Sequence, residues 1–315
     1  MTPAPANNRV LISGASGLIG RGVILALEER DWDIDALVRS PGTFNSVAVT
    51  EHVVPDLATA GITELREIIS NVSCILHLAA IVPGKEQSGS QDRRTVEMAR
   101  TLATAAAHSP HVRMIHMSSA YASLAERSHV SARQYGHSKL QAEIETRSTS
   151  PALQELIILR PPVVYGEGMH GAMSTLVGFV KKGLPLPFGR AHEKRAYISK
   201  RNLIDLLVKL ITAPTENPLV SGCKIYEPSD GIPVSTHTLI RMLAEALGTR
   251  PLLLPVPLSL LRLAGKVVGR NDLVSGAIEP LPLRGNEMLQ ADLGWTPMEK
   301  MPDSINSWLG KSVDH

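Results

Sequence analysis

Short apolar runs alternate with longer amphipathic segments over the first half of the chain. The runs are rich in Val, Ile and Leu and read RVLISG, DIDALVRS, EHVVPDL, SCILHLAA, VRMIHMSS and LIILRPPVVYG. Between them lie segments with helical spacing, such as LIGRGVILALEER and RRTVEMARTLATAAAHS. Nearly continuous apolar strands that alternate with helices are typical of a parallel sheet covered on both faces. The pattern predicts an α/β fold with a doubly wound parallel sheet.

The pattern changes after Gly166, where glycine and proline become frequent and strands no longer alternate with helices, as in GLPLPFG and EPSDGIPVS. Clusters of these residues indicate loops and element boundaries. We therefore expect a first domain over 1–165 and a smaller lobe over 166–315. A segment near 195–213 combines a strand pattern with a helix pattern, which predicts that it rejoins the first domain.

The charge balance is nearly neutral. The 315 residues include 32 Lys and Arg and 30 Asp and Glu, for a net charge of +2, without a run of basic residues. Nucleic-acid binders concentrate positive charge on one face, so we expect no nucleic-acid partner. Two cysteines are too few for a disulfide framework or a Cys-based metal site. His77, His116 and His137 lack the spacing of metal ligands, so we expect no metal.

The most apolar long stretch, PLLLPVPLSLLRLAGKVVG, is broken by Pro255 and Pro257 and carries Arg262 and Lys266. It predicts a loop followed by an amphipathic helix and not a membrane span. The first residues, MTPAPANNRV, lack the charged and then apolar pattern of a signal peptide. We therefore expect a cytoplasmic protein.

Three glycines, Gly14, Gly17 and Gly20, lie between the first strand and the first helix. The first permits a tight turn, the second lets backbone N–H groups approach a pyrophosphate, and the third lets the helix pack close to the strand. The helix N-terminus adds a favourable partial positive charge. A flexible loop is the alternative, but this position favours a dinucleotide site, with further contacts from Ser16, Leu18 and Ile19.

The end of the second strand bears on the choice of cofactor. An acidic residue there would bind the ribose hydroxyls of NAD and repel a 2′-phosphate. This chain has Val38 and then Arg39, and a guanidinium suits a phosphate. Asp35 competes as a ribose ligand, but it lies three residues before the strand end. We expect NADP(H), with NAD(H) as the alternative.

A tyrosine and a lysine, Tyr135 and Lys139, lie one helical turn apart in QYGHSKLQAE. A lysine held about 4 Å from the phenol would lower its pKa by up to about 3 units, which allows acid/base work near neutral pH. Ser118 and Ser119 end the strand VRMIHMSS, where ligands of open parallel sheets bind. Either serine could polarise a substrate carbonyl.

The glycine spacing, HLAA, the serine pair, YxxxK, LRPPVVYG, RAYI and ADLGWTP occur in one order along the chain. In these motifs the chain resembles the extended short-chain dehydrogenases/reductases, in the NAD-dependent epimerase/dehydratase family that acts on nucleotide sugars. The resemblance covers nearly the full length. It implies a Rossmann-type dinucleotide-binding domain and a substrate-binding lobe. It also implies Ser119, Tyr135 and Lys139 as catalytic residues.

The same resemblance assigns residues near the ligands. Residues implied near the cofactor, besides the glycine loop, Arg39, Tyr135 and Lys139, are Asp56, Leu57, Leu78, Ala79, Ala80, Pro162 and Val163. Residues implied near the substrate are Ser118, Ser119, Tyr121 and Arg195, the last at the substrate diphosphate. Relatives also pair the helix RRTVEMARTLATAAAHS and the helix of Tyr135 across a homodimer, so we expect a homodimer here.

Departures from the family pattern narrow the expected reaction. Dehydratases place Asp-Glu after the catalytic serine or threonine, whereas Ala120 and Tyr121 follow Ser119 here, which argues against dehydration. Thr95 replaces an asparagine of the family. Val163 or Val164 stands at a second position, where many epimerases of UDP-galactose carry an asparagine. The second lobe is similar to 4-ketoreductases of surface-polysaccharide synthesis.

These observations predict NADPH-dependent 4-keto reduction of a UDP-4-keto-6-deoxy-hexosamine. A 4-epimerase of nucleotide sugars with tightly bound NAD is the alternative. A non-catalytic NAD(P)-binding regulatory protein is a third reading. Such proteins commonly lose the tyrosine or the lysine, and this chain has both.

Overall fold

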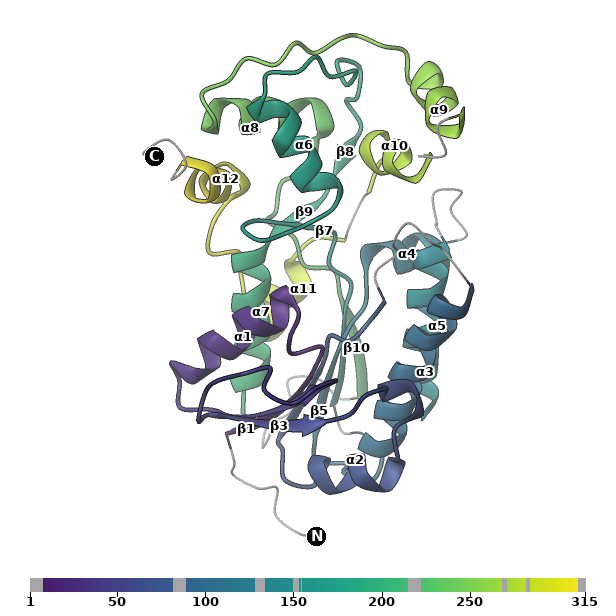
Figure 1. Ribbon diagram of the computed structural model, residues 1–315, viewed down its shortest axis with the longest axis vertical. Coiled ribbons are helices and arrows are strands. Elements are labelled where there is room, and N and C mark those ends of the chain that lie inside the picture. The colour runs from purple at the N-terminus through teal and green to yellow at the C-terminus, as the bar shows by residue number, and fades with distance from the viewer. Residues whose placement is uncertain are drawn as a thin grey trace. The chain divides into compact units, whose positions relative to one another are not determined.

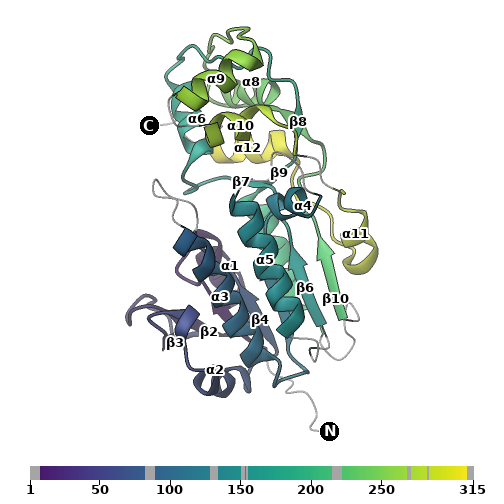
Figure 2. The ribbon, with the colours of Figure 1, turned by 90° about the vertical axis from the view of Figure 1, so that its right-hand side faces the viewer.

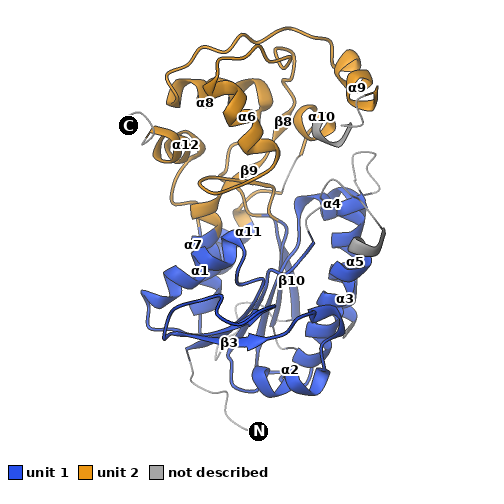
Figure 3. Ribbon diagram, in the orientation of Figure 1, with its two compact units in different colours: residues 1–160, 204–227, 288–295 blue, residues 161–203, 228–287, 296–315 orange. Residues whose placement is uncertain are grey.

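The computed structural model describes residues 8–81, 89–127, 134–149, 153, 155–214, 222–267, 271–281 and 284–310. The chain forms two compact units, shown in Figure 3. Unit 1 comprises residues 1–160, 204–227 and 288–295, and unit 2 comprises residues 161–203, 228–287 and 296–315. The first unit thus ends five residues before the boundary expected at 165. The chain returns to unit 1 over residues 204–227, which begin later than the expected segment near 195–213. It returns a second time over residues 288–295, which the sequence pattern did not predict.

Unit 1 contains a seven-stranded sheet in the order β10-β6-β5-β4-β1-β2-β3 (Figures 1 and 2). Every neighbouring pair is parallel. The strands are β1 (Arg9–Ser13), β2 (Asp33–Val38), β3 (Val49–Val53), β4 (Cys74–His77), β5 (Arg113–Met117), β6 (Glu155–Leu159) and β10 (Gly222–Tyr226). The order reverses at β1, as in dinucleotide-binding sheets. The predicted doubly wound α/β fold is confirmed.

Helices cover both faces of this sheet because its strands are apolar on both sides. The helices of unit 1 are α1 (Leu18–Glu28), α2 (Ile62–Ile69), α3 (Gly89–Ala106), α4 (Ala120–Glu126), α5 (Gln134–Thr149), most of α7 (Lys200–Thr212) and most of α11 (Glu287–Leu293), with a short 3-10 turn, η1 (Leu57–Thr59). Figure 2 shows α3 and α5 side by side over one face. Leu11, Ile75 and Met114 of the sheet are buried there with Leu65 of α2 and Leu102 of α3.

The returning segments of unit 1 are held by polar side chains as well as by packing. Arg113 of β5 donates to Glu155 of β6 over 2.6 Å, and the two residues are partners in the strand register. The same buried guanidinium donates to the carbonyl oxygens at the end of α7 and just after it, those of Leu210, Ala213 and Pro214. Trp295, which follows α11, donates to Asp205 of α7 over 2.8 Å. One arginine therefore ties the sheet to a segment that is almost 100 residues away in sequence.

Unit 2 is built from short strands and helices around its own apolar core. Its strands are β7 (Val163–Tyr165), β8 (Lys194–Arg195), β9 (Tyr197–Ser199) and β11 (Val234–Ser235), and its helices are α6 (Ala172–Lys181), α8 (Thr236–Ala246), α9 (Leu258–Val267), α10 (Asn271–Ile278) and α12 (Met301–Leu309). Tyr197, Leu243 and Ile305 lie in that core. The buried Asp230 accepts hydrogen bonds from the Tyr165 hydroxyl at 2.6 Å and from the Asn202 amide at 2.7 Å.

Candidate active site

The predicted glycine loop forms a cradle between β1 and α1. Gly14 has φ +73°, and a Cβ there would lie 2.8 Å from the backbone nitrogen of Ala79. A Cβ on Gly20 would lie 2.6 Å from the carbonyl oxygens of Gly14 and Ala15. Real side chains do not tolerate such approaches to backbone, so both positions require glycine. The loop folds tightly against the segment that follows β4.

The start of α1 is open to an anion. Its N-cap is Gly17, which has no side chain to satisfy the first N–H groups, and the first turn holds no acidic residue. Ser16 and Gly17 are exposed, whereas Leu18 and Ile19 are partly buried. Uncapped N–H groups and the partial positive charge of the helix end suit a phosphate group. The residues of this loop therefore fit the pyrophosphate of a dinucleotide.

The end of β2 holds Asp35, the candidate ribose ligand, and Arg39, the candidate ligand of a 2′-phosphate. Asp35 is buried, bonds to His52 at 2.7 Å and forms an ion pair with Arg9, whose Nε lies 3.3 Å from its carboxylate. These partners occupy its carboxylate. Arg39 follows the last residue of β2 and is exposed.

The segment after β4 packs beside the glycine loop. Ser13, at the end of β1, shares a hydrogen bond of 2.7 Å with His77 Nδ1 and accepts one from the Ala79 backbone at 3.4 Å. The backbone of Ile81 donates to Thr95 of α3 over 3.1 Å. Thr95, which replaces an asparagine of the family pattern, therefore anchors the segment after β4. Leu78, Ala79 and Ala80 are half-buried along it.

Asp56 caps η1 and pairs with a neighbouring arginine. Its carboxylate accepts from the Ala58 backbone at 3.1 Å and lies 3.0 Å from the Arg94 guanidinium. Leu57 is buried in the apolar cluster of α2 and α3. Their expected place beside the adenine stays a prediction.

The structure brings Ser119 and Tyr135 together. Ser119 is the N-cap of α4, where its hydroxyl accepts from the Tyr121 backbone at 3.3 Å. The side chains of Ser119 and Tyr135 share a hydrogen bond. The rings of Tyr121 and Tyr135 meet edge to face with centroids 6.3 Å apart. A Cβ on Gly136 would lie 2.5 Å from the Tyr121 carbonyl oxygen, so this glycine lets α5 approach α4.

Burial sets the protonation of Tyr135 and Lys139. It raises the pKa of Tyr135 to about 12, against a lowering by the hydrogen bond with Ser119. It lowers the pKa of Lys139 to about 8, and the nearby charge of Glu143 opposes this shift. Lys139 Nζ donates to the Met117 carbonyl over 2.9 Å. The expectation that Lys139 depresses the pKa of this tyrosine is therefore wrong for the protein alone, because desolvation raises this pKa and outweighs the hydrogen bond with Ser119.

The two serines at the end of β5 face different partners. The Ser118 hydroxyl donates to the buried carboxylate of Glu143, and its backbone donates to Leu159 of β6 over 2.7 Å. Ser119 faces Tyr135 instead. Successive residues at a strand end point to opposite sides, which separates the two hydroxyls. This geometry favours Ser119 over Ser118 as the serine that works with the tyrosine.

The remaining predicted site residues belong to unit 2. Pro162 is buried and Val163 is half-buried at the start of β7. Arg195 of β8 is buried, and its guanidinium donates to the carbonyl oxygen of Glu279. Their roles toward cofactor and substrate stay predictions.

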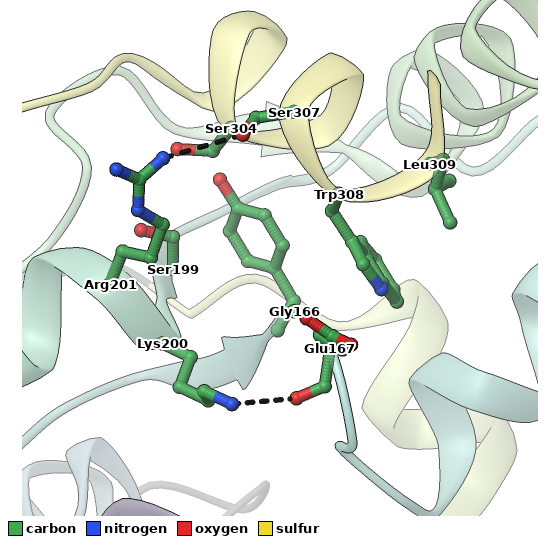
Figure 4. Close-up of a pocket in the computed structure, with 10 residues that line it drawn as sticks. Gly166, Glu167, Ser199, Lys200, Arg201, Ser304, Ser307, Trp308 and Leu309 are labelled. Carbon is green, nitrogen blue, oxygen red and sulfur yellow. Dashed lines mark hydrogen bonds between the residues drawn. The ribbon is translucent and has the colours of Figure 1, made fainter. Parts of the chain in front are cut away.

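Unit 2 also contains a pocket of about 570 Å³ that the sequence did not predict (Figure 4). Tyr165 and Trp308 form its aromatic wall, with ring centroids 6.2 Å apart. Lys200 donates to the Glu167 carbonyl over 3.1 Å, and Arg201 donates to the Ser307 hydroxyl over 3.3 Å. None of the predicted catalytic residues lines this pocket.

The described part of the chain contains neither a helix that could span a membrane nor a cluster of metal-binding side chains. No helix there has the length and apolar character to cross a membrane. No group of three or more His, Cys, Asp and Glu side chains gathers around a common point in those residues.

A match to a known family of proteins establishes the family of this chain. Residues 10–220 match the model of the NAD dependent epimerase/dehydratase family, which is more than half of the chain. The chain belongs to this family. The family is NAD dependent by its description, so this chain is of an NAD(P)-dependent enzyme type.

Members and structural neighbours of the family align over almost the whole chain. A UDP-glucose 4-epimerase of Vibrio cholerae is 29% identical over 94% of this chain and 93% of its own length. A ceramide reductase of Caulobacter vibrioides is 26% identical over 97% of this chain and 91% of its own. The structure of a Thermus thermophilus UDP-glucose 4-epimerase with NAD superposes with a TM-score of 0.70 at 19% identity, over 98% of this chain and 100% of that one. The last comparison confirms the fold.

Two buried histidines, His77 and His116, lie near Lys139. The rings of His77 and His116 have centroids 5.2 Å apart. Burial, with the charge of Lys139, lowers the pKa of His77 to about 3 and that of His116 well below 6.5. The Thr146 hydroxyl donates to the Ala142 carbonyl, so it accepts from His116 Nδ1 at 3.1 Å. Both imidazoles are therefore neutral in the folded protein.

We predict that these histidines make the protein sensitive to acid. A histidine with a lowered folded-state pKa binds its proton more readily in the unfolded chain, so stability falls as the pH drops below about 6.5. Each such histidine costs about 1.4 kcal/mol per pH unit in that range. Urea unfolding of the native protein and of His77→Asn, at pH values from 7.5 to 5, measures this. The His77→Asn variant should lose less stability per pH unit by about that amount.

The exposed His108 provides the control, because His108→Asn removes an imidazole from the surface of the same unit. This control should keep the native pH slope. Identical slopes for the native protein and His77→Asn would contradict the assignment of a buried neutral imidazole.

Proposed function

We propose that this protein is an NAD(P)-dependent oxidoreductase acting at a carbonyl or secondary alcohol of a nucleotide-activated sugar. Ser119, Tyr135 and Lys139 are its catalytic residues. The observation that carries the proposal is the hydrogen bond between Ser119 and Tyr135, with Lys139 one turn further along α5. These groups follow the carboxyl end of β5, and the glycine cradle follows the carboxyl end of β1, where ligands of open parallel sheets bind.

Each of the three side chains has a distinct task. The Ser119 hydroxyl orients and polarises the substrate oxygen. Tyr135 donates its phenolic proton to that oxygen during reduction, and it takes the proton back from an alcohol during oxidation. Lys139 supplies positive charge that favours the tyrosinate form. The nicotinamide, when bound, supplies or accepts the hydride at the carbon.

Several features support net reduction with NADPH. The exposed Arg39 at the end of β2 suits a 2′-phosphate, whereas the carboxylate of Asp35 is already paired with His52. Ala120 and Tyr121 occupy the positions where dehydratases carry Asp-Glu. The similarity to a ceramide reductase over 97% of the chain is consistent with a reductase of this length. The finer proposal is 4-keto reduction of a UDP-4-keto-6-deoxy-hexosamine, with Arg195 as the expected ligand of the diphosphate.

A 4-epimerase of UDP-sugars with tightly bound NAD is the second candidate. It is favoured by the similarity to the Vibrio cholerae UDP-glucose 4-epimerase, which extends over 94% of this chain. An epimerase would use the same three side chains in both directions within one turnover. It differs from a reductase in that the cofactor is regenerated and not consumed.

The first prediction of this proposal concerns Arg39. NADPH should bind more tightly than NADH, because the guanidinium can form charge-assisted hydrogen bonds to the 2′-phosphate. Arg39→Ala should remove most of that preference, about 1.5–3 kcal/mol or 10–150-fold in Kd. Fluorescence titration of both reduced cofactors against both proteins measures it. Arg66→Ala, which removes an exposed arginine of α2, is the control and should keep the preference. Equal affinities of the native protein for the two cofactors would refute it.

The second prediction separates the reductase from the epimerase. With a UDP-4-keto-6-deoxy-hexosamine, the native protein should oxidise one NADPH for each sugar reduced, measured as absorbance loss together with product analysis. Tyr135→Phe should bind NADPH normally and lose most of this turnover, because only the proton donor is removed.

Two results would contradict the reductase. One is interconversion of UDP-glucose and UDP-galactose, or of their N-acetyl forms, without added cofactor, which would establish the epimerase instead. The other is an absence of NADPH oxidation with every UDP-keto-sugar tested. Full turnover in Tyr135→Phe would show that another group supplies the proton.

A further inference from the structure

The carboxylate of Glu143 lies inside unit 1, next to Ser118, the neighbour of the proposed catalytic serine. It is fully buried on α5, one turn after Lys139. The Ser118 hydroxyl donates to Glu143 Oε1. Arg160 donates to both carboxylate oxygens, through Nε at 2.9 Å and through a terminal nitrogen at 2.6 Å. All of these contacts come from the ends of β5 and β6, so Glu143 joins two strands to the catalytic helix.

The arginine of this cluster extends the connection to α4. Its other terminal nitrogen donates to Glu126 over 2.6 Å and to the Ser123 hydroxyl over 3.2 Å. Burial lowers the pKa of Arg160, but the hydrogen bonds to Glu143 and Glu126 outweigh it and raise the pKa. The guanidinium is therefore charged, and it shares two carboxylates that differ in burial. Glu143 is fully buried, whereas the Glu126 side chain is about 41% exposed.

We propose that Glu143 is a positioning residue of the active site, which places a buried carboxylate one helical turn from Lys139 and holds Ser118, and with it Ser119, at the end of β5. The proposal rests on the proposed function, because it assigns the task of Glu143 to the reaction of Tyr135. Glu143 acts through Lys139 and Ser118 and does not itself reach the reacting atoms.

The groups that surround Lys139 explain why a buried carboxylate matters there. The ammonium donates to the Met117 carbonyl at the end of β5. Burial and the nearby charge of Lys139 lower the pKa values of His77 in β4 and His116 in β5, so both imidazoles are neutral. Neither imidazole therefore supplies a charge that would counter the effect of burial on Lys139. Tyr135, on the same helix, is protonated in the protein alone. Glu143 is the neighbour whose charge raises the pKa of Lys139. Without it, burial would lower the pKa of Lys139 further.

A purely structural brace is the competing reading, and Glu126 distinguishes the two. Glu126 binds the same guanidinium as Glu143, so its loss also weakens the Arg160 cluster. Its charge is not among those that shift the pKa of Lys139. A brace predicts similar effects of the two carboxylates on the lysine, whereas the proposed role predicts an effect of Glu143 alone.

The test is a direct titration of Lys139. The protein is labelled with 13C,15N-lysine, the Lys139 side-chain resonance is assigned with Lys139→Arg, and its shift is followed against pH by NMR. The native pKa should be well below the ordinary 10.5. Glu143→Gln should lower it by about one further unit, and the alkaline limb of kcat/KM for NADPH-dependent reduction should move with it. Glu126→Gln should leave both values unchanged.

Two outcomes would overturn the proposal: an unchanged Lys139 titration in Glu143→Gln, or equal shifts in Glu143→Gln and Glu126→Gln. Should Glu143→Gln fail to fold, the double variant Glu143→Gln/Arg160→Met leaves no unpaired buried charge and should show the same shift. The NMR titration needs no substrate. A protein in which Lys139 responds to Glu143 but which reduces no keto-sugar would support this role of the carboxylate while contradicting the proposed function.

Discussion

A buried ammonium group is costly, and the centre of unit 1 is arranged around one. Lys139 is almost completely buried at the carboxyl edge of the sheet, and its ammonium group bonds to a strand-end carbonyl. Desolvation favours the neutral amine, which is why the pKa of this lysine falls to about 8. Two features of the surroundings limit the desolvation cost of this ammonium group. The two neighbouring imidazoles are neutral, and a carboxylate one turn away is negative.

The same burial acts on the phenol that does the proposed chemistry. With a pKa of about 12, Tyr135 holds its proton in the protein alone. A protonated phenol is suited to donate to a substrate oxygen during reduction. The reverse reaction needs additional positive charge near the phenol, which oxidised nicotinamide carries. Under the proposed function, the protonation of Tyr135 is therefore coupled to the redox state of the bound cofactor.

The sequence predicted the features that depend on local pattern. The strands around β1, β4 and β5 are apolar runs, and the glycine loop has a fixed place between a strand and a helix. Tyr135 and Lys139 lie one turn apart by spacing alone. The choice between Ser118 and Ser119 needed the structure, because two adjacent serines look equivalent in a sequence. In the structure Ser118 bonds to Glu143, whereas Ser119 bonds to Tyr135. Burial at Tyr135 is equally invisible in spacing, which explains why its pKa was expected to move in the wrong direction.

Other parts of the site depend on contacts between distant segments. Glu143 and Arg160 are 17 residues apart and meet because α5 packs over the end of β6. The return of β10 and α11 to unit 1 is likewise set by tertiary contacts, such as those of Lys224 and Tyr226 with Asp292. Neither segment carries a motif that marks its destination. Gly136 is visible in the sequence as a glycine after Tyr135. The structure explains why glycine is needed there, because α5 approaches the Tyr121 carbonyl of α4 at this position.

Titration of the Tyr135 phenol with and without oxidised cofactor tests the account most directly. The chain has five tyrosines, so 13Cζ-tyrosine NMR, with Tyr135→Phe for assignment, can resolve this one. We predict a pKa of about 12 for Tyr135 in the protein alone. One positive charge at about 5 Å and an effective dielectric near 20 is worth about 3 kcal/mol, so saturating NADP⁺ should lower this pKa by about 2 units. A pKa that stays the same when NADP⁺ binds would contradict the account.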